Sequence, residues 1–255
     1  HTAFLSFDNP YSEYRMQLFG ITLDNLSRDD ALKRFLAWLS GTSFQRIATV
    51  NPEFLLLANE DQQFFSCLNQ ADYRVIDGFG IVIVGWLSRT QLTRFPGADL
   101  MEVLLGSAEK NGDSVFVAVR KDGLSSYGEI RAALKIQYPR LTVEGRDIDV
   151  KHLDSLKNDV IADIHASRAN ILFCNFGAPE QEYFVESFRE NPGSIRLAMG
   201  VGGSFDYLTG KIVRAPHCLR AVGLEWLWRL IQQPKRFGRI WSATVVFLFR
   251  SSLDK

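Results

Sequence analysis

The sequence lacks the features that mark disulfide-stabilised, zinc-binding and membrane-spanning proteins. Its 255 residues include only three cysteines, Cys67, Cys174 and Cys218, which lie far apart and are odd in number. They form neither a disulfide framework nor the paired spacing of a zinc site, and they fit a reducing cytoplasm. Residues 240–249 are mostly apolar, but a helix that spans a bilayer needs about 20 such residues. The first 40 residues do not resemble a secretory signal.

The chain also lacks net charge, although its charges are unevenly distributed. It has 29 basic and 29 acidic residues. Nine basic residues and only two acids fall in residues 211–255, which leaves 20 basic residues against 27 acids in residues 1–210. A basic segment attached to an acidic body suggests a polyanionic partner, such as nucleic acid, phosphate groups or an anionic membrane.

The composition itself is that of an ordinary globular protein, with 46% hydrophobic and 23% charged residues. The chain is long enough for one large or two small domains. Short apolar runs at residues 46–50, 73–76, 114–119, 171–176 and 195–199 alternate with helical patterns. Buried runs separated by helices are typical of a parallel sheet. We therefore expect an α/β fold, with a Rossmann-like, largely parallel sheet and helices on both faces.

The C-terminal region follows a different pattern. Apolar residues recur at helical spacing over residues 224–231 and again over 237–248, with basic residues beside the second stripe. We therefore divide the chain into a core, residues 1–210, and a basic amphipathic helical appendage, residues 211–255. The appendage suits a helix lying in a membrane interface. It could equally pack on the body or pair protomers, and its basic residues, Arg214 among them, could form a merely solvated face.

Polar and glycine residues follow the predicted strands. In an open parallel sheet, ligands bind beyond the carboxyl ends of the strands. Asn51, Asp77, Gly177 and the Gly200–Gly203 turn each follow an apolar run, so we expect them near one edge of the sheet. Asn51 is also a residue favoured at a helix N-cap, and Pro52 would then occupy the first helical position. Glycines and helix starts at this edge offer backbone N–H groups that suit a diphosphate.

Several of these residues also have purely structural explanations. Asp77-Gly78 is a common turn dipeptide. The Gly200–Gly203 turn resembles a dinucleotide fingerprint, but Phe205 replaces its third glycine and no ribose-binding acid follows at the expected distance, so NAD is not favoured. Glu182 falls in the first turn of a predicted helix, where an acid is favourable without a catalytic purpose.

Asp147 and Asp149 are candidate metal ligands. We expect a short strand over residues 141–143 and a helix over roughly 150–167, which leaves both aspartates in a polar loop. Their spacing is similar to the DxD metal motif of many sugar transferases, although two aspartates in such a loop are more often simply solvated.

Seven short motifs occur in a fixed order along the chain. They are T-V-N-P-E (49–53), D-G-F-G (77–80), R-F-P-G-A-D-L (94–100), F-G-A-P-E-Q-E (176–182), G-V-G-G-S-F-D (200–206), G-K-I-V-R-A-P (210–216) and G-L-E-W-L-W-R-L (223–230). Their order and spacing resemble the WecG/TagA/CpsF family of bacterial glycosyltransferases over roughly residues 15–240.

The resemblance implies an inverting, metal-independent transferase with a Rossmann-like core, a GT-E-like appendage and no cofactor. Such enzymes move a hexose or N-acetylhexosamine-type sugar from a UDP-sugar to a polyprenyl-diphosphate-linked sugar. They act at the cytoplasmic face of the bacterial plasma membrane, in the synthesis of cell-surface polysaccharides and exopolysaccharides. The donor sugar stays open among N-acetylmannosamine, its uronic acid and glucose, and so does the acceptor.

The resemblance also implies roles for individual residues. Asp77 corresponds to the aspartate that is the proposed catalytic base of the family. Thr49 and Asn51 correspond to the pocket threonine and asparagine of T-x-N-P. Arg94 and Gln181 correspond to the arginine ahead of G-x-D-L and the glutamine of P-x-Q-E.

The appendage of the family corresponds to about residues 211–250 of this chain. The resemblance implies that this segment closes over the site and meets the anionic membrane surface. Its arginines correspond to Arg229, Arg236 and Arg239, and one or more of them could meet the diphosphate. We expect no nucleic-acid partner, because the tail carries no fingerprint of a known nucleic-acid-binding module.

Without a metal, the diphosphate charge must be met by helix N-termini and arginines. Gly177 and the turn that contains Gly200, Gly202 and Gly203 are the expected sources of N–H groups. Asp206, which follows that turn, is a weaker candidate for a contact with the nucleotide ribose.

The chain departs from the family pattern at three places. Thr93 stands where the family has an acid, Glu180 stands where it has a lysine, and Val119–Gly123 replaces a glycine-rich turn. These departures leave two rival hypotheses open. One is a non-catalytic, membrane-attached binding or scaffold protein that retains the fold. The other is a metal-dependent sugar transferase that uses Asp147 and Asp149.

Overall fold

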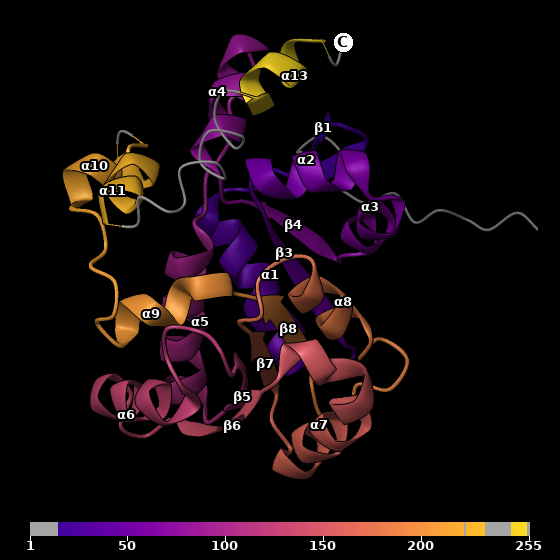
Figure 1. Cartoon of the computed structure of the whole chain (residues 1–255), viewed down its shortest axis with the longest axis vertical. Coiled ribbons are helices and arrows are strands. Elements are labelled where there is room, and N and C mark those ends of the chain that lie inside the picture. The colour runs from indigo at the N-terminus through magenta and orange to yellow at the C-terminus, as the bar shows by residue number, and fades with distance from the viewer. Residues whose placement is uncertain (1–14, 222, 233–245, 254–255) are drawn as a thin grey trace, which may run out of the picture.

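A computed structural model describes residues 15–221, 223–232 and 246–253 (Figure 1). Its centre is a six-stranded sheet in the order β4-β3-β8-β7-β5-β6, in which every neighbouring pair runs parallel. The strands are β3 (Gln45–Val50), β4 (Tyr73–Ile76), β5 (Ser114–Arg120), β6 (Thr142–Ile148), β7 (Ile171–Cys174) and β8 (Leu197–Gly200). A separate antiparallel hairpin consists of β1 (Arg15–Leu18) and β2 (Ile21–Asp24). The predicted parallel α/β fold is confirmed.

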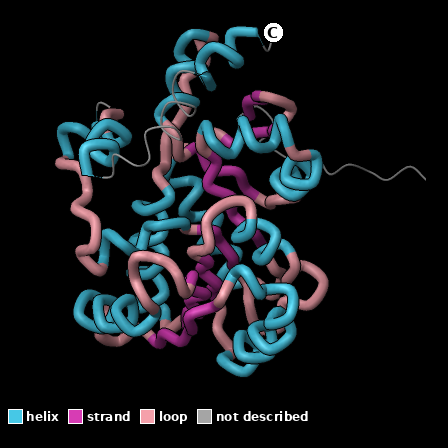
Figure 2. The backbone as a smooth tube through the Cα atoms, in the orientation of Figure 1, coloured by secondary structure: helices cyan, strands magenta, loops and turns pink. Residues whose placement is uncertain are grey.

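Helices cover both faces of this sheet, and Figure 2 shows the strands lying centrally between them. The apolar cluster on one face draws on α1 (Arg28–Ser40), α5 (Gly97–Asn111) and α6 (Tyr127–Gln137). The clusters on the other face draw on α2 (Pro52–Glu60), α3 (Gln62–Asn69), α7 (Leu153–Ser167) and α8 (Glu180–Glu186).

Strand β5 shows how the sequence builds both layers. Its valines at 115, 117 and 119 belong to one cluster, and Phe116 and Ala118 belong to another. Successive side chains of a strand point to opposite faces, so a continuous apolar run is buried on both sides. Each large side chain buried in this way contributes roughly 1.5–3 kcal/mol.

The start of α2 confirms a local prediction. The Asn51 side chain accepts a hydrogen bond from the backbone N–H of Phe54 at 3.1 Å, and Pro52 occupies the first helical position. A proline there loses nothing, because that N–H has no partner within the helix. The cap fixes the chain direction immediately after β3, at the edge of the sheet where the candidate site was expected.

The structure corrects the prediction for residues 141–149, whereas the helix expected over roughly 150–167 is confirmed by the short 3₁₀ helix η2 (Val150–His152) and α7. Strand β6 has seven residues and extends to Ile148, so Asp147 lies in a strand, opposite Val119 of β5. Asp149 precedes η2, and α7 follows. The longer strand was missed because β6 is an edge strand with mostly polar, partly exposed side chains, which give no apolar run.

The remaining helices are α4 (Phe79–Leu87), η3 (Gly202–Ser204), α9 (Phe205–Leu208), α10 (His217–Ala221), α11 (Glu225–Gln232) and α13 (Phe247–Leu253). Helix α11 confirms the helical pattern predicted for residues 224–231, whereas most of the second stripe lies outside the described residues. Figure 1 shows α10 and α11 outside the two helical layers, while α13 packs against α4. Within the described ranges, no helix is long and apolar enough to span a membrane.

Candidate active site

A cavity of about 350 Å³ opens beyond the carboxyl ends of β3, β4, β7 and β8. This is the edge of a parallel sheet at which ligands are expected. Eight of the residues proposed from the sequence line it: Thr49, Asn51, Asp77, Arg94, Gly177, Gln181, Gly202 and Gly203.

Asp77 enters the cavity directly after β4. Its backbone N–H donates to the Val50 carbonyl at 2.9 Å, which extends the pairing of β3 and β4 by one residue. Its carboxylate Oδ1 accepts from the backbone N–H of Gly97 at 3.2 Å, and Gly97 is the first residue of α5. The N-terminus of a helix favours a negative group. The fold therefore holds an acidic side chain at a fixed place on the cavity wall.

Gln181 lies between the two glycine-containing loops. Its side-chain Oε1 accepts from the backbone N–H of Gly177 at 3.1 Å and from that of Gly202 at 3.0 Å. We expected both N–H groups to bind a diphosphate, but both already donate to Gln181. The glutamine oxygen therefore competes with a diphosphate for them. In this structure the glutamine joins the loop after β7 to the loop after β8.

The orientation of Gln181 depends on its neighbour Glu182. The Gln181 Nε2 donates to Glu182 Oε1 at 3.1 Å, and Glu182 Oε2 lies 2.6 Å from Arg46 Nη1. Both charged side chains are fully buried, at 0% exposure. Burial raises the pKa of Glu182, and the Arg46 charge opposes that shift. Glu182 falls in the first turn of α8, as predicted, but it also forms a buried ion pair that the sequence did not indicate.

The floor of the cavity, which we define as the strand ends beneath Asp77 and Gln181, is completed by two contacts at Gly200. The hydroxyl of Thr49 donates to the carbonyl of Gly200 at 3.4 Å, which links the ends of β3 and β8. Gly200 itself lies under the glutamine, and a Cβ there would overlap the side chains of Gln181 and Glu182. Gly200 thus allows Gln181 to approach the sheet.

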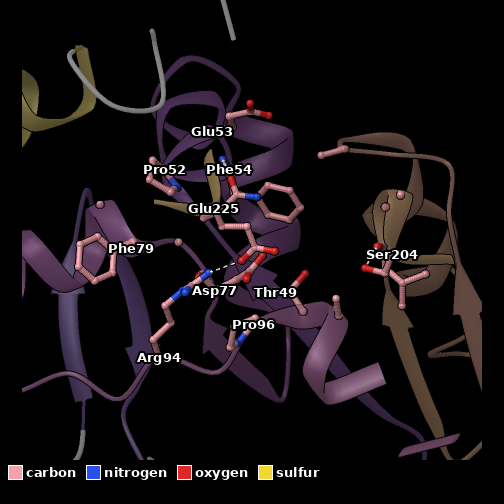
Figure 3. A pocket seen from close by; sticks show the side chains of 18 of the residues that line it. Thr49, Pro52, Glu53, Phe54, Asp77, Phe79, Arg94, Pro96, Ser204 and Glu225 are labelled. Carbon is pink, nitrogen blue, oxygen red and sulfur yellow. Dashed lines mark hydrogen bonds and ion pairs between the residues drawn. The ribbon is translucent and has the colours of Figure 1, made fainter. Parts of the chain in front are cut away.

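Arg94 lies at the mouth of the cavity, on the segment between α4 and α5. Its Nε donates to the Asp77 carbonyl at 2.6 Å, and its Nη1 lies 3.4 Å from the Arg220 carbonyl. Its Nη2 donates to Glu225 Oε2 at 3.2 Å. Figure 3 shows the Arg94 and Glu225 side chains pointing toward one another beside Asp77. Two segments far apart in sequence thus meet on one guanidinium.

Several lining side chains were not singled out from the sequence. Phe54 and Phe79 each follow a strand end within a few residues. The rule that ligands bind beyond the carboxyl ends of parallel strands could therefore have identified both. Of the described lining residues, Glu53, Asp77 and Glu225 are acids and Arg94 is a base. The described wall is therefore acidic overall. The missed charged and aromatic side chains are Glu53, Phe54, Phe79, Tyr207 and Glu225.

Some predicted residues are not brought to the cavity. Asp206 does not line it, is nearly buried, and accepts a hydrogen bond from Ser125 Oγ at 2.7 Å. Arg229 belongs to α11, but its side chain lies outside the described part of the structure. Arg236 and Arg239 lie outside the described residues altogether. The ribose contact of Asp206 and the diphosphate contacts of the three arginines stay predictions.

The two candidate metal ligands lie elsewhere. Asp147 Oδ1 accepts from the backbone N–H of Tyr127 at 2.8 Å. Asp149 Oδ1 accepts from the N–H of Lys151 at 3.1 Å, and its Oδ2 lies 3.1 Å from His152 Nδ1. Neither aspartate lines the cavity. Both have local structural roles at the end of β6 and the start of η2.

The four basic side chains that the structure describes in residues 211–255 are all paired with acids of the body. Arg214 is only 16% exposed, so its proposed solvated position is wrong. Such pairs attach the C-terminal segment to the helical layers. They are Lys211–Glu129 at 2.6 Å, Arg214–Asp99, Arg214–Glu102 at 3.3 Å, Arg220–Asp99 at 3.7 Å and Arg250–Glu60 at 2.8 Å.

A model of a known protein family matches most of the chain. The model of the Glycosyl transferase WecG/TagA/CpsF family matches residues 16–255, which includes every strand end that forms the cavity and the C-terminal segment that reaches it. A match of that length shows the family. The chain therefore belongs to the WecG/TagA/CpsF family of glycosyl transferases.

Proposed function

We propose that the protein transfers a hexose or N-acetylhexosamine-type sugar from a UDP-sugar to a polyprenyl-diphosphate-linked acceptor, with inversion and without a metal. The proposed process is the synthesis of a bacterial cell-surface polysaccharide. The observation that carries this proposal is the position of Asp77. Its carboxylate is held by the Gly97 N–H on the wall of a cavity at the carboxyl ends of parallel strands.

The proposed reaction is a direct displacement at the anomeric carbon. The acceptor hydroxyl oxygen forms a bond to that carbon while the bond to the diphosphate oxygen breaks, and the electron pair leaves with UDP. The hydroxyl proton passes to the Asp77 carboxylate. General-base assistance of this kind contributes about 10²–10⁴-fold to the rate.

The leaving diphosphate needs positive charge or N–H donors. Arg94 is the one cation among the described residues that line the cavity. Gly203 and Ser204, in the short helix η3, also line the cavity and bring backbone close to it. Because the described wall is otherwise acidic, we propose that Arg229, Arg236 or Arg239 supplies further positive charge.

The Asp77→Asn variant tests the proposed base. We expect UDP binding within a fewfold of the unmodified protein and a loss of turnover of about 10²–10⁴-fold. The assay follows product mass with a panel of UDP-sugars and lipid-diphosphate sugar acceptors, with and without EDTA. The matched control is Asp147→Asn/Asp149→Asn. Near-normal turnover of Asp77→Asn would remove Asp77 as the base.

The same assay separates the rival hypotheses. Loss of product in EDTA, together with inactivity of the Asp147→Asn/Asp149→Asn protein, would favour the metal-dependent transferase. UDP binding without product from any donor and acceptor pair would favour a non-catalytic binding protein. Product formed in EDTA identifies both a metal-independent transfer and the donor sugar.

We propose further that the protein binds the cytoplasmic face of the plasma membrane through α4 and α13. Trp86 and Leu87, at the end of α4, are 76% and 69% exposed, and Phe249 on α13 is 67% exposed. Figure 1 shows these two helices together at one end of the molecule. The exposed Arg89 follows α4. Aromatic and aliphatic side chains beside a cation suit an anionic lipid interface.

Liposome cosedimentation tests this membrane proposal. We expect Trp86→Ser/Leu87→Ser to lose most of its binding to vesicles that contain anionic lipid. Ile136→Ser is the matched control, because Ile136 is 85% exposed but lies on α6, far from α4 in Figure 1. Unchanged vesicle binding with a changed sedimentation coefficient would instead show that the surface pairs protomers.

A further inference from the structure

Glu225 brings the C-terminal segment into the cavity. It is the first residue of α11, and its side chain is 18% exposed. Its Oε2 accepts from Arg94 Nη2 at 3.2 Å, and its Oε1 lies 3.8 Å from Arg214 Nε. Arg214 in turn pairs with acids of α5. The carboxylate thus lies between an arginine of the body and an arginine of its own segment.

The hydrogen bonds of Arg94 show how much depends on this contact. A guanidinium has five N–H groups in a fixed fork. Three of them are directed at the Asp77 carbonyl, the Arg220 carbonyl and Glu225. Two of these three acceptors belong to residues 220–225. The orientation of the one described cation in the cavity wall therefore depends on the C-terminal segment, and two N–H groups remain for a ligand once the contacts with described residues are counted.

The turn that carries Glu225 is closely fitted to the body. Gly223 has φ +76°, in the left-handed region that favours glycine. A Cβ at this position would overlap the ring of Phe79, the first residue of α4. Gly223 and Phe79 therefore set the distance between the start of α11 and the Asp77-Gly78 turn.

We propose that Glu225 is a positioning residue of the active site, which holds the Arg94 guanidinium so that its two remaining N–H groups face the substrate diphosphate. The kinetic part of this inference rests on the proposed function. The C-terminal segment then takes part in the reaction through an acid, independently of its arginines and of any contact with lipid.

The first test uses Glu225→Gln with a short, soluble diphosphate-linked acceptor, so that membrane binding does not limit the rate. We expect kcat to fall at least tenfold while the Kd for UDP changes less than threefold, because orientation rather than binding is lost. Glu225→Asp, which keeps the charge, should retain more activity than Glu225→Gln. Glu60→Gln is the matched control, since it breaks the Arg250–Glu60 pair outside the cavity.

A double-mutant cycle shows whether Glu225 acts through Arg94. In an Arg94→Ala background, we expect Glu225→Gln to have no further effect on kcat. An equal loss in both backgrounds, or a kcat of Glu225→Gln within twofold of the unmodified protein, would overturn the inference. Much tighter UDP binding by Glu225→Gln would also overturn it, because Glu225 would then be a competitor of the diphosphate.

A readout without turnover separates this inference from the proposed function. Amide hydrogen exchange in residues 217–232 should increase in Glu225→Gln and in Gly223→Ala, but not in Glu60→Gln. Failure of the unmodified protein to transfer any sugar would count against the proposed function alone. Unchanged exchange in both Glu225→Gln and Gly223→Ala would overturn the positioning role whatever the activity.

Discussion

Two arginine–glutamate pairs flank the cavity, and they differ in how far they are removed from water. Arg46 and Glu182 lie beneath the floor, 2.6 Å apart and at 0% exposure. Arg94 and Glu225 lie at the mouth, 3.2 Å apart and at 17% and 18% exposure. The first pair joins β3 to α8 within the core, whereas the second joins the loop before α5 to the C-terminal segment.

Each glutamate fixes a neighbouring side chain that lines the cavity. Glu182 accepts from Gln181, and Glu225 accepts from Arg94. A buried charge that loses its partner is strongly destabilising, whereas a partly solvated pair contributes little to stability. The two pairs are therefore chemically similar but differ in what their loss would change. Breaking the Arg46–Glu182 pair should lower the free energy of unfolding. Breaking the Arg94–Glu225 pair should lower the transfer rate more than it lowers the free energy of unfolding.

The largest expected effect comes from Arg46→Met. This change leaves Glu182 buried without its cation, and removal of one partner from such a pair costs about 3–5 kcal/mol. Urea denaturation measures the loss of free energy of unfolding. Glu225→Gln, measured in parallel, should lose less than about 1 kcal/mol, as expected for a partly solvated pair. Similar losses in the two variants would break the distinction between floor and mouth.

A smaller effect is expected from Gln181→Leu. The substitution removes the acceptor shared by the N–H groups of Gly177 and Gly202. It also removes the Nε2 donor to the fully buried Glu182 Oε1, and a buried polar group left without its partner costs about 1–3 kcal/mol. Denaturation should show a loss in that range, and the two loops should lose their common anchor, so kcat/KM should fall as well. A variant with normal stability and normal kcat/KM would show that the loops are held by other contacts.

Much of the floor was predictable because its signals are local. A buried apolar run, an N-cap and a proline at the first helical position identify the end of β3 from consecutive residues. The rule that ligands bind beyond parallel strands then brings Asn51, Asp77 and Gly177 to one edge. No contact between distant residues has to be known for either step.

The ion pairs were not predictable in the same way. Arg46 and Glu182 are 136 positions apart, and Arg94 and Glu225 are 131 apart. A charged residue at the start of an apolar run gives no indication of which acid it will meet. The basic C-terminal segment was interpreted through its net charge, which does not reveal that Lys211, Arg214 and Arg220 pair with the body. Specific pairing follows from tertiary packing.

The smallest effect is expected at a third ion pair, Lys211–Glu129, which is more exposed to solvent than the other two pairs. Its side chains are 42% and 44% exposed. The pKa of Glu129 is lowered to about 2, chiefly by the hydrogen bond from Lys211 and then by those from Ser126. A carboxyl pKa below its ordinary value stabilises the fold above about pH 4.5, and this contribution is lost as the pH falls through about 2.

Lys211→Met isolates that contribution. NMR titration should show the pKa of Glu129 rising toward its ordinary value while staying below it, because Ser126 still donates. The stability difference from the unmodified protein should be small at pH 7 and should shrink as the pH falls below about 4.5. Turnover on a soluble acceptor should not change, since neither residue lines the cavity. A large loss of turnover would mean that the attachment of the C-terminal segment at α6 controls the cavity mouth as Glu225 does, and exposure would no longer rank the three pairs.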